Sequence, residues 1–137
     1  MSRHLQRDME NLQRRLLSLC GKVEELVGKA TRAFRSRNAV HAQEVVEADH
    51  AVDLQEVEIE EECLKTLALH QPVAVDLRRI ATALKVNSDL ERMADLAVNI
   101  AERTSGLVDA PEFPIPHALD QMAELTRAMV RRSLDAL

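Results

Sequence analysis

Apolar residues recur at every third or fourth position through the first quarter of the chain, without interruption. They are Leu5, Met9, Leu12, Leu16, Leu19, Val23, Leu26, Ala30 and Ala33. This spacing places them all on one side of a single long α-helix. A lone helix is marginal in water, and Gly21 and Gly28 weaken this one further. The sequence therefore predicts a helix that is stabilised by packing against other helices.

Three more helical segments follow. The turn after the first helix contains Asn38, which suits the N-cap of a second helix that runs to about residue 69. Pro72 ends that helix and is expected to begin the third, which extends to about residue 104. The third helix is apolar on more than one side, so we expect it to be the most buried. Residues 117–137 show the amphipathic pattern again, after a segment that contains three of the four prolines.

The composition agrees with a purely helical protein. The 137 residues include three Gly, two Phe and no Trp or Tyr, which leaves little of the chemistry of strands and turns. We therefore predict an all-α fold in which the second and third helices form an antiparallel hairpin about Pro72. The last helix cannot bury its apolar face alone, so it must pack on the bundle, on another copy or on residues that this chain lacks.

The charges are unevenly distributed. Residues 3–37 hold nine Lys or Arg against four acids, and residues 41–65 hold nine acids against one Lys. The basic segment lacks aromatic residues for base stacking, so we expect no nucleic-acid binding.

Cys20 and Cys63 lie in apolar registers that fit core positions in a reducing compartment. No signal peptide or apolar run of roughly 20 residues is present, so we expect a cytoplasmic protein without direct membrane insertion.

The second helix carries a row of acids where an apolar face would be expected. Asp49, Asp53, Glu56 and Glu60 recur at steps of four, three and four, which at about 100° per residue gathers them in an arc of about 60°. Apolar residues flank the arc on both sides: Val45, Val52, Ile59 and Cys63 on one flank, and Val46, Val57 and Leu64 on the other. The four acids therefore sit in the middle of the face where a core would be expected.

The third helix carries a matching pair of acids. In an antiparallel hairpin about Pro72, residues whose numbers sum to about 144 lie at the same level, so Asp49 faces Asp95 and Asp53 faces Glu91. Four carboxylates packed together are costly unless protons or cations neutralise them. We therefore predict that these four carboxylates bind a metal ion.

Three neighbouring residues are further candidates, either as ligands or as hydrogen-bond partners of ligands: Asn99, Glu56 and Glu102. The expected cofactor is a divalent or trivalent metal ion, with iron, zinc, manganese, magnesium and calcium all open. Several carboxylates can bridge more than one ion, so the site can be multinuclear.

Two other interpretations stay open. In the first, the acid row faces solvent or pairs with basic residues of the first helix, namely Arg14, Arg15, Lys22 and Lys29. The protein would then be a helical interaction module with an acidic surface for partners and no metal. The second is a carboxylate-bridged di-iron enzyme, which needs a Glu-x-x-His pair on each of two helices. Glu47 and His50 supply only one such pair, so we expect that the protein is not an enzyme.

Two stretches resemble the PhoU family, regulators associated with high-affinity phosphate transport. They are LALHQPVAVDLRRIATALKVNSDLERMADLAVNIAE at residues 67–102, similar to the family signature, and VVEADHAVDLQEVEIEEECLKTLAL before it, similar to the family's second helix. The resemblance implies that residues 1–106 form an antiparallel three-helix bundle and that 107–117 is a proline-rich linker. Residues 118–137 would be a fourth helix, either the start of a second, incomplete bundle or a dimerisation element.

The resemblance also implies a function. Family members usually have two bundles in tandem, each with acid motifs that bind multinuclear metal clusters, and here those motifs are Asp49-xxx-Asp53 and Glu91-xxx-Asp95. The implied role is that of a cytoplasmic negative regulator between a phosphate ABC transporter and a sensor histidine kinase, which represses the phosphate-starvation response. Only one bundle and one further helix are present here, so we expect a homodimer in which two copies supply the missing contacts.

Overall fold

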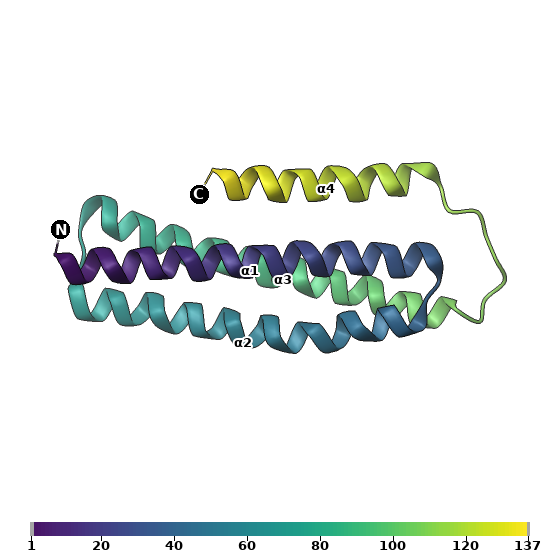
Figure 1. Ribbon diagram of the computed structural model, residues 1–137, viewed down its shortest axis with the longest axis horizontal. Coiled ribbons are helices and arrows are strands. Elements are labelled where there is room, and N and C mark those ends of the chain that lie inside the picture. Colours follow the sequence, from purple (N-terminus) through teal and green to yellow (C-terminus); the bar gives the residue numbers. More distant parts are fainter. Residues whose placement is uncertain (1, 137) are drawn as a thin grey trace.

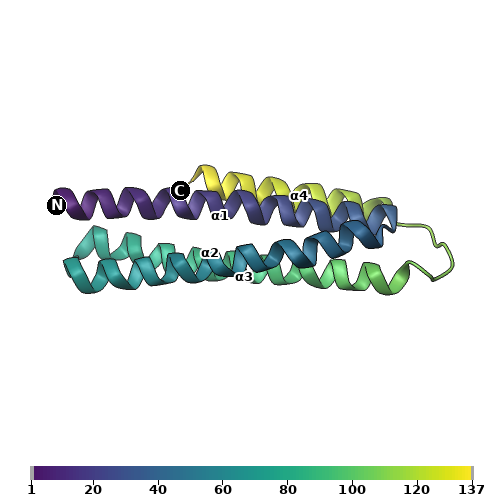
Figure 2. The ribbon, with the colours of Figure 1, turned by 60° about the horizontal axis from the view of Figure 1, so that its bottom comes forward.

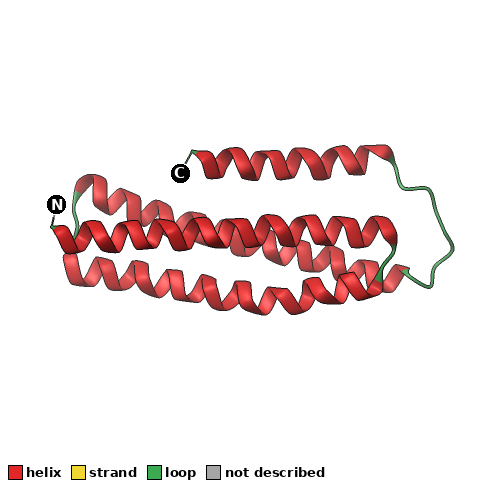
Figure 3. Ribbon diagram, in the orientation of Figure 1, coloured by secondary structure: helices red, strands yellow, loops and turns green. Residues whose placement is uncertain are grey.

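The computed structural model describes residues 2–136, which form four α-helices and, within that range, no β-strand (Figures 1 and 3). The helices are α1 (Arg3–Ser36), α2 (Ala39–His70), α3 (Ala74–Leu107) and α4 (His117–Asp135). Helices α1, α2 and α3 contact one another pairwise and form an up-down-up bundle (Figure 1). The predicted all-α fold and the hairpin about Pro72 are therefore confirmed. Met1 and Leu137, which end the first and last predicted segments, lie outside the residues that the structure describes.

Helix α1 contributes most to the core. Its apolar stripe is buried as the spacing predicts, and four of its residues are completely inaccessible: Leu19, Val23, Ala30 and Ala33. The expectation that the third helix is the most buried is wrong, because α1 has ten buried residues and α3 has eight, and Leu77 and Leu96 of α3 are exposed. Cys20 and Cys63 are buried free thiols, and burial raises the pKa of each to about 11. No helix in the described range is long and apolar enough to span a membrane.

Local signals set the ends of the helices in the bundle. Asn38 caps α2 as predicted, because its Oδ1 accepts hydrogen bonds from two backbone N–H groups of the first turn at 3.0 and 3.1 Å. Pro72 does not begin α3, which starts at Ala74 instead. Gln71 adopts the left-handed conformation at the end of α2 and Val73 stays extended. Ala74 also has a positive φ, at 51°, so regular helical geometry resumes only after it.

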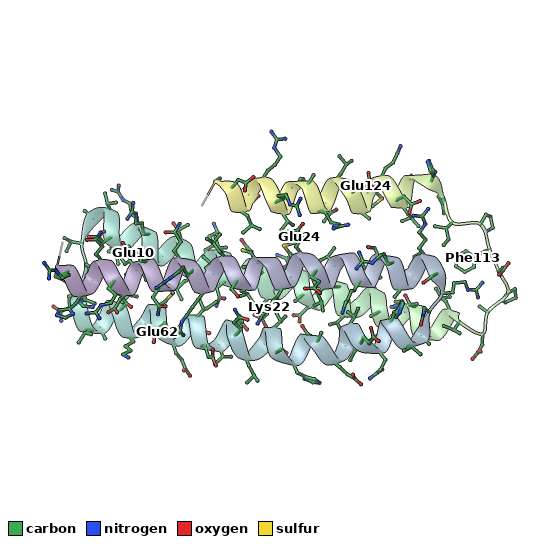
Figure 4. The ribbon with its side chains drawn as sticks, in the orientation of Figure 1. Glu10, Lys22, Glu24, Glu62, Phe113 and Glu124 are labelled. Atoms are coloured by element: carbon green, nitrogen blue, oxygen red, sulfur yellow. The ribbon has the colours of Figure 1, made fainter. Side chains whose placement is uncertain are left out.

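The segment between α3 and α4 is anchored to the turn between α1 and α2 by Arg37. The Arg37 guanidinium donates hydrogen bonds to the backbone oxygens of Leu107, at 2.6 Å, and Ala110. It also lies over the ring of Phe113, 5.6 Å from the ring centre (Figure 4). These contacts fix the start of the proline-containing segment and thereby the position from which α4 returns along the bundle.

Helix α4 lies along α1 on the side away from α2 (Figures 1 and 2). Its backbone lies close to that of α1 and not to that of α2 or α3. Arg35 pairs with Asp120 at 3.2 Å, and Arg131 pairs with Glu24 at 3.0 Å; Figure 4 shows Glu24 on the side of α1 that faces α4. No described residue of α4 is fully buried. The fourth helix therefore packs on the bundle, but through one side only.

Candidate functional site

Three carboxylates meet where α2 and α3 face each other. One side-chain oxygen from each of Asp49, Asp53 and Asp95 lies within 4.8 Å of the other two. Asp49 and Asp53 are half-buried, and Asp95 is exposed. The i, i+4 spacing on α2 and the antiparallel hairpin produce this cluster, so the structure brings together three of the four predicted ligands.

Glu91, the fourth predicted ligand, lies beside Glu56 rather than within the cluster. Burial, followed by the charge of Glu91 and a hydrogen bond to it, raises the pKa of Glu56 to about 7. Helical side chains lean toward the N-terminus of their own helix, so those of α3 lean toward the Pro72 turn and those of α2 lean away from it. An acid on α3 therefore meets residues of α2 that lie later in the chain than its level partner. Asp95 reaches Asp53 as well as Asp49, and Glu91 reaches Glu56.

The other two candidates lie apart from the cluster. Asn99 lines a cavity between α1, α3 and α4, and Glu102 is exposed two helical turns beyond Asp95. The alternative pairing of the acid row with α1 is not found among residues 2–136. Lys22 donates a hydrogen bond to Gln55 at 2.7 Å, on the side of α1 that faces α2 in Figure 4, and the ion pairs within this range join other groups.

The acid arc lies at the edge of the α2–α3 pair and does not point into the core. Val45 and Ile59, on one flank of the arc, are fully buried, whereas Val57 and Leu64 on the other flank are 47% and 53% exposed. The arc therefore lies beside the core, along an edge of the bundle, as the solvent-facing interpretation has it. Helix α2 is rotated so that one apolar flank fills the core, and this rotation leaves the acids within reach of ions from solvent.

Asp49 is the carboxylate with the highest electrostatic cost in the cluster. Its Oδ1 is buried and has no hydrogen-bond partner. Burial raises the pKa of Asp49, and the charges of Asp53 and Asp95 raise it further. A buried acceptor without a donor costs about 1–3 kcal/mol, and a cation would remove both this cost and the repulsion. The three carboxylates therefore fit a hard cation that is held by oxygen ligands.

Sequence reasoning missed Asn87, which positions α2 beside the acids. This residue is 2% exposed, and its Nδ2 donates to the backbone oxygen of Glu56 at 2.9 Å. Its Oδ1 is buried without a partner. The available signal was its register, since Asn87 occupies the same side of α3 as buried Ile80, Ala83, Leu90 and Ala94. An amide in an apolar row predicts a polar contact between helices.

Comparisons with known proteins agree with the fold. A family model described as PhoU domain matches residues 16–104. The relative in Aquifex aeolicus, named phosphate-specific transport system accessory protein PhoU homolog, is 38% identical over 128 residues, which cover 93% of this chain and 58% of that protein. The relative of the same name in Deinococcus radiodurans is 38% identical over 131 residues, or 96% of this chain and 59% of that protein.

The structural comparison extends through all four helices. The crystal structure of PhoU from Pseudomonas aeruginosa matches with a TM-score of 0.91 at 34% sequence identity. The match covers 96% of this chain and 63% of that one. This chain thus spans less than two thirds of the length of these relatives. The family domain covers α1 from residue 16, all of α2 and most of α3, including every carboxylate of the cluster. The chain belongs to the PhoU family.

Proposed function

We propose that this protein is a non-enzymatic regulator of phosphate transport that binds metal on the α2–α3 face. The names of its relatives, accessory proteins of the phosphate-specific transport system, support the link to transport. The proposed role is negative regulation of the phosphate-starvation response, between a phosphate ABC transporter and a sensor histidine kinase. The protein performs it in the cytoplasm as a homodimer. The kinase and the direction of regulation rest on family resemblance.

One observation carries the metal half of this proposal: the buried, unpartnered Oδ1 of Asp49 inside a cluster of three carboxylates. Asp49, Asp53 and Asp95 would hold the ion, and the adjacent pair of Glu56 and Glu91 extends the row of oxygen ligands toward a second one. A bound cation supplies positive charge between two helices that otherwise repel each other there. Metal binding would therefore stabilise the hairpin and fix the surface that α2 and α3 present to partners.

A second candidate function is favoured by one specific feature of α2. Leu54 is 68% exposed, and it lies with Val57 and Leu64 among acids that point to solvent. An apolar surface bordered by acids suits docking to a basic partner segment without any metal. This alternative predicts a thermal stability that does not depend on chelators.

Metal analysis of protein purified without chelator separates the two functions. We compare the wild type with a site variant, Asp53→Asn/Asp95→Asn, and with a control, Glu47→Gln/Glu58→Gln, which removes two exposed acids from α2. The wild type and the control should retain metal and lose thermal stability in EDTA, and the site variant should do neither. Equal, negligible metal in all three proteins would eliminate the metal half. Redox activity after iron loading would instead favour the di-iron enzyme.

The regulatory half is tested in cells. Deletion of the gene should derepress phosphate-responsive expression when phosphate is plentiful. A plasmid copy of the wild type should restore repression, and the Asp53→Asn/Asp95→Asn copy should fail to do so. Unchanged repression in the deletion strain would contradict the regulatory role, whatever the metal content of the protein.

A further inference from the structure

The hairpin end, residues 64–79, presents apolar side chains to solvent. It comprises the last turns of α2, the turn at Pro72 and the first turns of α3 (Figure 1). Four of its apolar residues are 44–75% exposed: Leu69, Val73, Val75 and Leu77. They lie within nine positions of the chain around a three-residue turn, so they gather at one end of the bundle. Together they expose roughly 400 Å² of surface, as much as the largest patch of a typical monomer, which is often functional.

Positive charge accompanies these apolar side chains. Residues 41–63 hold nine acids and no Lys or Arg, whereas the hairpin end holds Lys65, Arg78 and Arg79 against one acid. The three basic side chains are exposed, and they join none of the ion pairs that the described part of the chain forms. In a chain with a net charge of −5, the hairpin end is therefore a local positive surface.

The hairpin end is held firmly against the bundle. His70 Nε2 lies 2.8 Å from Asp8 Oδ2, which ties the last residue of α2 to α1. Pro72 fixes its own φ and restricts the residue before it. Gln71 and Ala74 have positive φ, at 44° and 51°, a conformation that is costly for residues with a side chain. Backbone strain of this kind concentrates at binding sites, and a surface that is already ordered loses little entropy when it binds.

We propose that the hairpin end docks into an apolar groove with an acidic rim on a protein partner, and that this partner is the ATP-binding subunit of the phosphate ABC transporter. The choice of partner rests on the proposed role in phosphate transport. The ATP-binding subunits of an ABC transporter face the cytoplasm, so a cytoplasmic regulator can reach them. Val73 and its apolar neighbours enter the groove, and Arg78 and Arg79 pair with the acids of the rim.

The residue types favour a protein over a lipid surface. Segments that recognise anionic lipids carry about four to eight Lys or Arg, and interfacial anchors are commonly aromatic. The hairpin end has three basic residues and no aromatic one. Arginine, which supplies two of the three, is enriched at protein interfaces, where lysine is depleted.

Titration of this protein into the purified ATP-binding subunit from the same organism, followed by calorimetry, tests the surface. Val73→Asp places an acid among the apolar side chains, and Arg78→Glu/Arg79→Glu reverses two charges. Each variant should raise the dissociation constant by roughly 10-fold or more. The wild-type affinity should also fall as salt is added, because exposed charges contribute to it.

Leu54→Asp is the matched control. Leu54 is 68% exposed and Val73 is 75% exposed, so both substitutions place an acid at an exposed apolar position of the same hairpin. Circular dichroism checks that each variant keeps its helices. The control should change the dissociation constant by less than about twofold. Absence of binding by the wild type, equal weakening by the two aspartate variants, or weakening by Leu54→Asp alone overturns the proposal.

Vesicles of phosphatidylcholine and phosphatidylglycerol test the lipid alternative without the partner. The wild type should not sediment with them. Sedimentation that Val73→Asp abolishes would identify an anionic lipid surface as the occupant and overturn the proposal.

The surface and the proposed function can fail separately. Sixteen residues of α2 separate Asp53 from Leu69, about 24 Å along the helix, so Val73→Asp should retain as much metal as the wild type. If gene deletion leaves repression unchanged while Val73→Asp weakens binding, the regulatory role fails and the surface stands. If deletion derepresses while binding is indifferent to Val73→Asp, the role stands and the surface is overturned.

Discussion

Asp49 has three features that each make its ionised form less favourable, and no other acid of α2 is described with all three. It is half-buried, one of its oxygens has no hydrogen-bond partner, and two more aspartates lie within reach. Folding tolerates this arrangement because each cost is only about 1–3 kcal/mol and the apolar core of the same helix opposes it. A residue kept in such a position is one whose removal should stabilise the free protein and impair the function.

Asp49→Asn tests this trade-off directly. The amide keeps the shape of the side chain and removes its charge, so the metal-free protein should gain stability on the order of 1 kcal/mol. The variant should also lose metal affinity. Urea unfolding in EDTA and a metal titration measure the two effects. Asp109→Asn, at an exposed position beyond α3, should change neither. An Asp49→Asn protein that is less stable than the wild type in EDTA would contradict this account.

Glu56 predicts how stability depends on pH. Its pKa is raised from 4.5 to about 7 in the folded protein, so between these values the folded state holds a proton that the unfolded state has released. Stability must then fall as the pH rises through this window. We expect the metal-free protein to be more stable at about pH 5 than at about pH 8, by on the order of 1 kcal/mol once solvent screening is allowed for.

The matched variants for the pH dependence are Glu56→Gln and Glu58→Gln. Gln at position 56 can still donate a hydrogen bond to Glu91 but cannot titrate, so the pH slope should decrease. Glu58 is exposed on another side of α2, and its variant should keep the slope of the wild type. Urea midpoints measured as a function of pH decide the matter, and identical slopes in the two variants would count against the role of Glu56.

At the residue scale, spacing predicted the Asp49, Asp53 and Asp95 cluster but not its details. Spacing gives the angle of a residue on its helix and its level in the hairpin, and those suffice for short side chains at matching levels. The pairing of Glu91 with Glu56 depends on the length of the two glutamate side chains and on the direction in which each leans. Pairing residues by their level along the hairpin does not include these effects. Whether the four carboxylates bind metal stays a prediction.

At the scale of elements, the turns before and after α2 each contain a residue in the left-handed conformation, and the side chains of these two residues differ in their contacts. Arg37 after α1 and Gln71 after α2 both have positive φ, at 53° and 44°. Glycine adopts this conformation without the steric cost that other residues bear. The Arg37 side chain holds the segment after α3 by hydrogen bonds, whereas no such contact is described for the side chain of Gln71, which is exposed.

The two glycine variants should therefore act in opposite directions. Gln71→Gly should stabilise the protein by about 0.5–1 kcal/mol, because it relieves the backbone cost without loss of a side-chain contact. Arg37→Gly relieves the same cost but removes two hydrogen bonds and the contact with Phe113, so it should destabilise by about 1–2 kcal/mol net. Thermal and urea unfolding of the two variants measure the difference. Equal effects at both positions would show that the Arg37 contacts add nothing.

The helices themselves were the most predictable elements, because apolar spacing is local. Each of the four helices was placed to within a few residues, and Asn38 was identified as a cap from its residue type. The rotation of α2 was not predictable in the same way. Val45 and Val57 are both apolar, and only the shape of the space left by α1 and α3 decides that Val45 is buried and Val57 exposed.

For the whole molecule, α1 separates two surfaces of different character. The carboxylate cluster lies where α2 meets α3, and α4 lies across α1 from α2 (Figures 1 and 2). The backbone of α4 approaches neither α2 nor α3. Sequence alone could not predict this separation, because a lone amphipathic helix pattern in residues 117–137 does not specify which groove of the bundle it occupies. Mutations of the carboxylate cluster and mutations of α4 should thus act independently of each other.

Removal of α4 is the sharpest test of that separation. A chain that ends at Ala110 keeps both backbone acceptors of Arg37 and all of the carboxylate cluster. It should remain a folded three-helix bundle with a stability lower by on the order of 2 kcal/mol, because α4 has no fully buried residue and orders 19 residues against one helix. Circular dichroism should show the remaining helices intact, and metal content should match that of the full chain. An unfolded or metal-free truncated chain would show that α4 belongs to the same cooperative unit as the site.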